Sequence, residues 1–164
     1  LATIGSDGRP RSRVVLLKET SCNGLVFFTH YISPKGEQLA ANPVASATFW
    51  WPQLMRQVRA VGAVTKLTRQ ENETYFAKRP RNSQLGAWAS RQSAPIVSRD
   101  DLLEAASQAA ERFEGKDVPC PPEWGGYRID VDEFEFWQGQ SGRLHDRVLA
   151  RRNVDGWSAI HIQP

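Results

Sequence analysis

The chain has 164 residues, of which 40% are hydrophobic and 24% are charged, and its formal net charge at pH 7 is +3. This length supports one well-buried domain, expected to cover residues 1–164, and is too short for two domains of ordinary size. The 21 Lys and Arg residues are scattered singly or in pairs, which favours separate phosphate contacts over a nucleic-acid-binding stripe. No apolar run approaches the length of a membrane span.

The two cysteines, Cys22 and Cys120, lie far apart and belong to no CxxC motif or His cluster. A disulfide between them stays open, but no disulfide framework or metal site is visible, so we expect a reducing, cytoplasmic location. We find no signal-peptide pattern. The chain starts at Leu1 inside a predicted strand and without a Met, so we expect an N-terminal segment to precede it.

Short runs rich in Val, Phe, Trp and Thr, bounded by turn residues, predict a mainly antiparallel sheet. Residues 12–18 hold four contiguous apolar residues between Arg13 and Lys18, so we expect a strand buried on both faces. Asn23-Gly24 predicts a hairpin turn. About seven strands with short connections favour a barrel. The predicted strands are residues 1–4, 12–18, 25–29, 44–51, 57–67, 127–131 and 157–162.

Four helices are predicted from their start signals. Ser33-Pro34 begins the first, because Pro is favoured at the first helical position. Thr68 with Glu71 forms a capping box, and Ser98 with Asp101 caps the longest helix. The predicted helices are residues 34–42, 68–78, 82–89 and 98–113, with loops at 91–97 and 115–123.

Residues 135–147 combine an apolar run, a Gly-rich turn and a cluster of charge. If both arms of this predicted hairpin are strands, Arg143, His145 and Arg147 alternate onto one face. Two cations and an imidazole are costly in a core but suit an anionic, planar ligand. The alternative is a solvated hairpin edge, whose charges discourage strand aggregation.

Several familiar catalytic patterns are absent from the sequence. It contains no Ser-His-Asp arrangement, paired catalytic carboxylates, metal-ligand spacing, GxGxxG or P-loop. Basic residues instead lie at predicted element ends beside Ser, Thr or Gln, which suits phosphate binding, although each alone is more simply a surface charge. These basic residues are Arg13, Lys18, Lys35, Arg79, Arg81, Arg143 and Arg147.

Seven segments spread over nearly the whole chain match the motifs of one family in order. The segments are residues 13–18, 33–36, 56–58, 79–88, 90–93, 124–126 and 135–147. Arg-Pro-Arg-x-Ser-Gln-x-Gly-Ala-Trp at 79–88 and Arg-Leu-His-Asp-Arg at 143–147 are together highly specific. On these segments the chain resembles the pyridoxine (pyridoxamine) 5′-phosphate oxidase family.

The resemblance implies a mainly β fold with helices (α+β), an antiparallel split β-barrel, in a homodimer with FMN at each subunit interface. It implies oxidation of pyridoxine or pyridoxamine 5′-phosphate at C4′ by hydride transfer to flavin N5. Reoxidation by O₂ would give H₂O₂ beside the product, pyridoxal 5′-phosphate. The redox chemistry belongs to the cofactor, while the protein supplies anchoring and orientation. No metal, nucleic acid or membrane partner is expected.

Matching positions assign site residues, again as the resemblance implies. Arg143 and His145 would cover the pyridine ring as catalytic residues, and Arg147 would stabilise negative charge on the flavin. For His145, proton transfer and a purely positioning hydrogen bond both stay open. The substrate-binding residues would be Lys18, Tyr75, Arg79, Ser83, Arg143, Leu144 and His145. The FMN-binding residues would be Arg13, Val14, Val15, Leu16, Leu17, Lys18, Phe28, Thr29, Pro34, Lys35, Gln57, Gln92, Ser93, Trp137 and Arg147.

Two positions depart from the family pattern. Pro34 stands where a basic residue is usual, which removes one phosphate contact, although Pro suits a helix start. Phe28 stands where an aromatic hydroxyl is common, which removes a possible polar contact. We expect Trp50, Trp51 and Trp88 to lie in the core or an interface rather than against a cofactor.

Three other functions stay open. A related split-barrel flavin oxidase of the phenazine-pathway type would act on another small aromatic substrate, but the phosphate-binding set of Lys18, Tyr75, Arg79 and Ser83 argues against it. A non-catalytic protein could hold FMN or pyridoxal 5′-phosphate without turnover. A nucleic-acid-binding barrel is the weakest alternative, because the sequence shows no basic stripe with interleaved aromatics.

Overall fold

The computed structural model describes residues 1–22 and 24–164, which divide into two compact units. The first unit comprises residues 1–26, 38–65 and 128–164, and the second comprises residues 27–37 and 66–127. Each unit is described by itself below. That residues 1–164 form a single domain stays a prediction.

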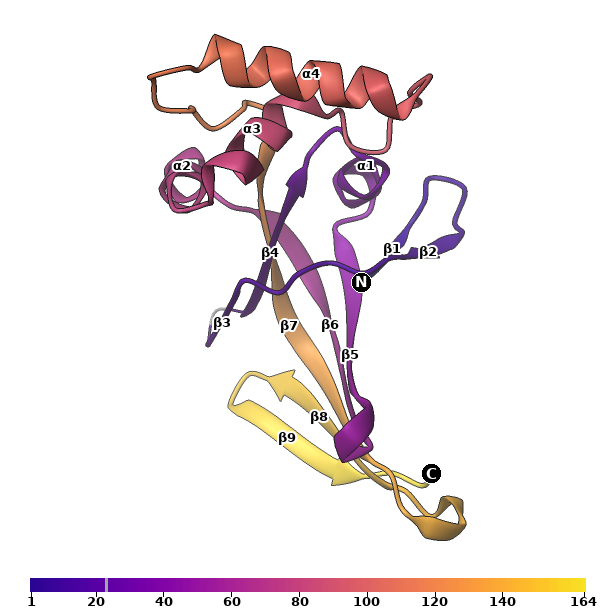
Figure 1. Cartoon of the computed structure of the whole chain (residues 1–164). Helices are drawn as coiled ribbons and strands as arrows, with labels where there is room; N and C mark the ends of the chain where they lie inside the picture. The colour runs from indigo at the N-terminus through magenta and orange to yellow at the C-terminus, as the bar shows by residue number, and fades with distance from the viewer. Residues whose placement is uncertain (23) are drawn as a thin grey trace. The chain divides into compact units, whose positions relative to one another are not determined.

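Over the described residues the strands form one nine-stranded sheet in the order β2-β1-β5-β6-β7-β4-β3, and β8 pairs with β7 and β9 (Figure 1). Each pairing for which a register is given is antiparallel, as predicted. The strands are β1 (Ala2–Ile4), β2 (Pro10–Ser12), β3 (Glu19–Ser21), β4 (Gly24–His30), β5 (Val44–Trp51), β6 (Arg56–Lys66), β7 (Trp124–Gln138), β8 (Asp146–Asn153) and β9 (Gly156–His161).

Strands β3 and β4 pair at the predicted turn, with Ser21 opposite Gly24, but the first strand of the pair is residues 19–21 and not the predicted 12–18. Asn23, the other half of the predicted turn signal, lies outside the described residues. Gly24 has a φ of +119°, and a Cβ there would lie 2.1 Å from the carbonyl oxygen of Ile129. Only glycine therefore permits this close approach of β4 to β7.

The four predicted helices are present, and α1, α2 and α4 begin at the predicted start signals. Ser33 Oγ accepts a hydrogen bond from the Gly36 N–H at 3.4 Å. Both predicted capping boxes form, from Thr68 with Glu71 and from Ser98 with Asp101. No helix among the described residues is both long and apolar enough to cross a membrane. The helices are α1 (Pro34–Ala41), α2 (Arg69–Ala77), α3 (Arg81–Ala89) and α4 (Arg99–Arg112) (Figure 1).

The predicted two-face-buried strand over residues 12–18 is wrong. β2 ends at Ser12 and residues 13–18 have no regular structure, with Val14 94% and Leu16 68% exposed. The Arg13 N–H donates to the Leu1 carbonyl and the Lys18 N–H donates to the Val26 carbonyl. These backbone bonds tie down the two ends of the segment, so its apolar residues stay on the surface.

The predicted alternation of Arg143, His145 and Arg147 along one strand face is also wrong. Gly142 and Arg143 both have a φ of +64°, and residues 141–143 form a short 3₁₀ turn. β8 begins only at Asp146, so Arg147 alone of the three lies in the strand, directly opposite Trp137. Two successive left-handed residues are incompatible with an extended arm, which is why the hairpin begins later than predicted.

The second unit has an aromatic core. Phe76, Phe113 and Trp124 are buried there, and Trp88 packs against this cluster as predicted. In the first unit Trp50 and Trp51 are 49% and 43% exposed, so neither belongs to the core of a single chain. Whether these two tryptophans lie in an interface stays a prediction.

The cap of α4 gives a test of local stability. Ser98→Ala should lower the free energy of unfolding by about 1 kcal/mol, because the Asp101 N–H loses its hydrogen bond to Ser98 Oγ. Urea denaturation measures the change. Ser107→Ala is the matched control, since this exposed serine lies inside the same helix, where alanine is at least as favourable. Equal losses in both variants would contradict the capping role.

Candidate functional site

A buried lysine lies among neutral oxygens in the second unit. Lys35, in the first turn of α1, is 8% exposed, and its Nζ donates to Thr29 Oγ1 at 3.0 Å and to Gln92 Oε1 at 2.9 Å. Gln92 Oε1 also accepts from Thr29 Oγ1 at 2.6 Å. The structure therefore brings together three of the predicted FMN-binding residues. A cation with hydroxyl and amide groups around it is a donor set that suits a phosphate monoester.

Two further predicted residues lie next to this cluster in sequence but not in its hydrogen-bond network as described. Ser93 is exposed with a φ of +67°, and Pro34 is exposed at the first position of α1. Pro34 begins the helix without a side-chain donor, as its sequence position predicts.

His30 follows Thr29 in β4 and is 9% exposed. Burial lowers the pKa of His30 from its ordinary value, the positive charges of Lys35 and Arg79 lower it further, and Glu123 raises it. The neutral imidazole is therefore the favoured form in this cationic environment.

Arg79 lies against aromatic rings in the same unit. Its guanidinium carbon is 4.6 Å from the ring centroid of Trp124, a cation–π distance. Its Nη1 is buried and has no hydrogen-bond partner among the described residues. Burial lowers the pKa of Arg79 from its ordinary value. A buried, unsatisfied guanidinium nitrogen is costly, so an anionic ligand there would be stabilising.

Tyr75 lies in the same aromatic stack as Arg79. Its ring packs on Phe28 with centroids 3.9 Å apart and planes 10° from parallel, and Phe28 in turn stacks on Trp124 at 5.1 Å. Phe28, predicted to contact FMN, here supports a predicted substrate residue. Ser83, in the first turn of α3, is exposed.

In the first unit, Arg13 is anchored by neutral oxygens. Its Nη1 donates to Thr3 Oγ1 at 2.6 Å and its Nη2 to Gln38 Oε1 at 3.0 Å. Burial and the nearby charge of Arg11 lower the pKa of Arg13. Sequence reasoning missed Thr3 and Gln38. Of the neighbouring predicted residues, Val15 is half-buried and Val14, Leu16, Leu17 and Lys18 are exposed.

Two predicted flavin-contacting residues, Gln57 and Trp137, line one cavity of the first unit with a volume of about 380 Å³. The Trp137 ring lies 5.9 Å from the Trp50 ring and 4.7 Å from the His145 ring, centroid to centroid. An aromatic wall with an amide beside it suits a flat heteroaromatic ring.

His145 is held by the turn that precedes β8. Its Nδ1 accepts the Gln140 backbone N–H at 3.1 Å, so a neutral imidazole carries its proton on Nε2. Arg143 and Leu144, on either side of the end of the 3₁₀ turn, are exposed. The turn therefore presents Arg143 and Leu144 to solvent and half-buries His145.

A buried carboxylate in the first unit was missed by sequence reasoning. Glu135 is 4% exposed and pairs with Arg147 and with Arg59. The signal that could have found it was its place in the matched segment 135–147, two residues before Trp137, a predicted FMN-binding residue.

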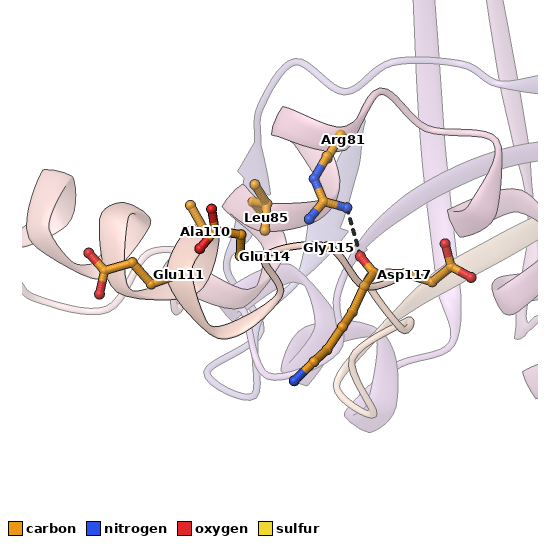
Figure 2. A pocket seen from close by; sticks show the side chains of 8 residues that line it. Arg81, Leu85, Ala110, Glu111, Glu114, Gly115 and Asp117 are labelled. Atoms are coloured by element: carbon orange, nitrogen blue, oxygen red, sulfur yellow. Dashed lines mark hydrogen bonds between the residues drawn. The ribbon is translucent and has the colours of Figure 1, made fainter.

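A second cavity, of about 610 Å³, lies in the second unit beside the end of α4 (Figure 2). Arg81 lines this cavity and donates to the carbonyl oxygens of Lys116 at 2.9 Å and Phe113 at 2.6 Å. These bonds satisfy carbonyls after the last turn of α4, so Arg81 has a structural role here.

The family models match nearly the whole chain. The model described as pyridoxamine 5′-phosphate oxidase matches residues 1–114, and the model described as pyridoxine 5′-phosphate oxidase C-terminal dimerisation region matches residues 124–164. A pyridoxine/pyridoxamine 5′-phosphate oxidase of Rubrobacter xylanophilus is 49% identical over 164 residues, which cover 100% of this chain and 76% of the relative. The chain belongs to the pyridoxine/pyridoxamine 5′-phosphate oxidase family.

Two solved structures are similar in fold to this chain. PhzG from Burkholderia lata, in complex with tetrahydrophenazine-1-carboxylic acid, has a TM-score of 0.93 and 33% identity, covering 99% of this chain and 80% of that one. A pyridoxamine 5′-phosphate oxidase-related, FMN binding protein from Nostoc punctiforme has a TM-score of 0.79 at 20% identity, covering 99% and 86%. The predicted α+β split-barrel fold of the pyridoxine/pyridoxamine 5′-phosphate oxidase family is confirmed.

The positive charge of Lys35 should have a measurable effect on the pKa of His30. In NMR titrations His30 should have a pKa below 6.5, and Lys35→Met should raise it, because one of the positive charges that oppose protonation is removed. Lys116→Met, which removes an exposed lysine on another segment of the same unit, should leave the pKa unchanged. An unchanged pKa in Lys35→Met would show that Lys35 does not act on His30.

Proposed function

We propose that this protein oxidises pyridoxine 5′-phosphate and pyridoxamine 5′-phosphate to pyridoxal 5′-phosphate with bound FMN. The alcohol and O₂ give pyridoxal 5′-phosphate and H₂O₂; the amine, O₂ and water give pyridoxal 5′-phosphate, ammonia and H₂O₂. The observation that carries the proposal is the 49% identity, over the full chain, to an oxidase of that name. The buried, unsatisfied Nη1 of Arg79 supports it, because the substrate carries a phosphate.

The residues present fit FMN. In the second unit, Lys35, Thr29 and Gln92 offer an ammonium, a hydroxyl and an amide, which suit a phosphate. In the first unit, taken by itself, the Trp137 cavity suits a flat ring. When bound, FMN accepts a hydride from C4′ of the substrate and passes two electrons to O₂. The residues proposed to hold FMN are Arg13, Val14, Val15, Leu16, Leu17, Lys18, Phe28, Thr29, Pro34, Lys35, Gln57, Gln92, Ser93, Trp137 and Arg147.

A second group of residues would hold the substrate. The guanidinium of Arg79 can donate from its unpartnered Nη1 to a phosphate oxygen, and the hydroxyl of Tyr75 lies in the same aromatic stack. Fixing the phosphate fixes the orientation of the pyridine ring. The residues proposed to bind substrate are Lys18, Tyr75, Arg79, Ser83, Arg143, Leu144 and His145.

His145 is the proposed proton-handling group. Because Nδ1 accepts the Gln140 N–H, Nε2 is the nitrogen available to the substrate, where it can hold or move a proton at the C4′ substituent. Arg143 would act beside it as a fixed positive charge over the ring.

We propose a homodimer as the working assembly. The match of residues 124–164 to a dimerisation region supports it. Exposed apolar side chains in the first unit support it as well, among them Val14, Trp50, Phe136 and Trp157.

The likeness to PhzG favours a second candidate function, oxidation of a small aromatic compound without a phosphate. The identity to PhzG is 33%, against 49% to the Rubrobacter oxidase. The phosphate-ester substrate is therefore the better supported one.

One aerobic assay tests these functions. Purified protein with FMN is given pyridoxine 5′-phosphate, pyridoxine, or a dihydrophenazine carboxylic acid, and product and H₂O₂ are measured. Turnover of pyridoxine 5′-phosphate alone supports the proposal. Turnover of the phenazine compound alone supports the second candidate, and bound flavin without turnover indicates a binding protein.

Arg79→Ala tests the substrate phosphate contact. The KM for pyridoxine 5′-phosphate should rise about 10- to 100-fold, as expected when a charge-assisted hydrogen bond worth about 1.5–3 kcal/mol is lost. The FMN content should stay nearly unchanged. Arg99→Ala, at an exposed arginine of α4, is the control for loss of a positive charge. Loss of FMN instead of substrate affinity would show that Arg79 serves the cofactor phosphate.

A further inference from the structure

A carboxylate on β7 is buried between two arginines in the first unit. Glu135 Oε2 lies 2.6 Å from Arg59 Nη2, and Glu135 Oε1 lies 2.9 Å from Arg147 Nη2 and accepts the Arg147 Nε–H at 3.0 Å. Arg59 comes from β6 and Arg147 from β8, so one side chain joins three strands. Buried carboxylates are stable only when paired in this way.

The guanidinium of Arg147 is held at all three nitrogens. Its Nε and Nη2 bind Glu135, and its Nη1 donates to the Gln163 carbonyl oxygen at 2.8 Å. A guanidinium has five N–H groups, and these contacts use three, leaving one on Nη1 and one on Nη2. The two remaining N–H groups therefore point in directions that Glu135 and Gln163 determine.

The charges of Glu135, Arg59 and Arg147, called the Glu135 group here, sum to +1, because one carboxylate offsets one of two guanidinium groups. The neighbouring pair Glu133–Arg151 lies on the same two strands, with an N–O distance of 2.8 Å, but Arg151 is 65% exposed and solvent screens the pair. Glu135 is 4% exposed, while the Arg147 side chain is 26% and the Arg59 side chain 47% exposed, so solvent screens the net charge of these three residues only in part.

We propose that Glu135 is a positioning residue that acts through Arg147, by fixing its guanidinium and limiting the positive charge beside the flavin, and so sets the reduction potential of bound FMN. This inference rests on the proposed function, with Arg147 stabilising negative charge on the flavin as the family resemblance implies. Positive charge near the ring favours the reduced cofactor, because negative charge builds up there on reduction.

The test is the midpoint potential of FMN bound to the whole protein in four variants. Glu135→Gln raises the charge of the Glu135 group from +1 to +2. The ratio of reduced to oxidised FMN at a fixed potential should therefore rise about 10-fold, which is the scale expected for a change of one charge in a partly buried site. Arg59→Met lowers the charge to zero and should shift the ratio the opposite way. The double variant restores +1 and should return towards wild type. Glu133→Gln, the matched control, should not change the ratio.

The outcomes separate the proposals. Opposite shifts in Glu135→Gln and Arg59→Met, with recovery in the double variant, support the role of Glu135. Shifts of the same sign, or none, in proteins that bind FMN overturn it. If Glu135→Gln does not fold, Arg59→Met and the double variant decide alone, because both avoid a buried excess of two cations. A wild-type protein that binds FMN without oxidising the substrate overturns the proposed function only, and one that binds no FMN overturns both.

Discussion

Buried positive charge is the constraint on which this structure depends. A cation removed from water must regain its lost hydration from the protein or from a ligand. Lys35 and Arg13 do so with hydroxyl and amide oxygens, Arg147 with a carboxylate, and Arg79 with the face of Trp124. Neutral oxygens and aromatic faces compensate a cation only partly. Arg13 and Arg79 therefore remain able to gain from an anion, while Arg147 already shares the carboxylate of Glu135 with Arg59.

This difference separates two kinds of work. Cations that face only neutral oxygens or aromatic rings suit phosphate binding, because the affinity comes from the charge–charge attraction that they still lack. Arg147, which is paired with a carboxylate, suits a site where its position and a modest positive charge matter more than binding affinity for an anion. A flavin oxidase acting on a phosphate ester needs both kinds, since it must hold two phosphates and tune one ring.

Much of the fold could be predicted from local signals. The capping boxes at Thr68 and Ser98 correctly gave the starts of α2 and α4, because a cap is decided by neighbours within one turn. The exposure of residues 13–18 was not predictable in this way, and a buried strand was wrongly expected there. An apolar run indicates a strand only if another element covers it, and no covering element is encoded within the run itself.

The site was predictable in its residue types and less so in its geometry. Lys35, Thr29 and Gln92 lie together, although Gln92 is far from the other two in sequence, and that they bind FMN stays a prediction. The arrangement of Arg143 and His145 depends on positive φ angles at Gly142 and Arg143. The sequence does not predict the second of these, because a non-glycine residue rarely has a positive φ. Glu135 was overlooked because acids in a strand are usually solvated charges, and only the pairing of β6, β7 and β8 shows that this one is buried.

β9 has a consequence for handling the protein. Every residue of this strand is exposed, including Trp157 and Ile160, and the strand pairs only with β8 among the described residues. In a single chain it would offer an apolar, unprotected backbone edge of the kind that seeds fibrous aggregates. Association into the proposed dimer would cover it. Dilution, by favouring separated chains, should then expose this edge.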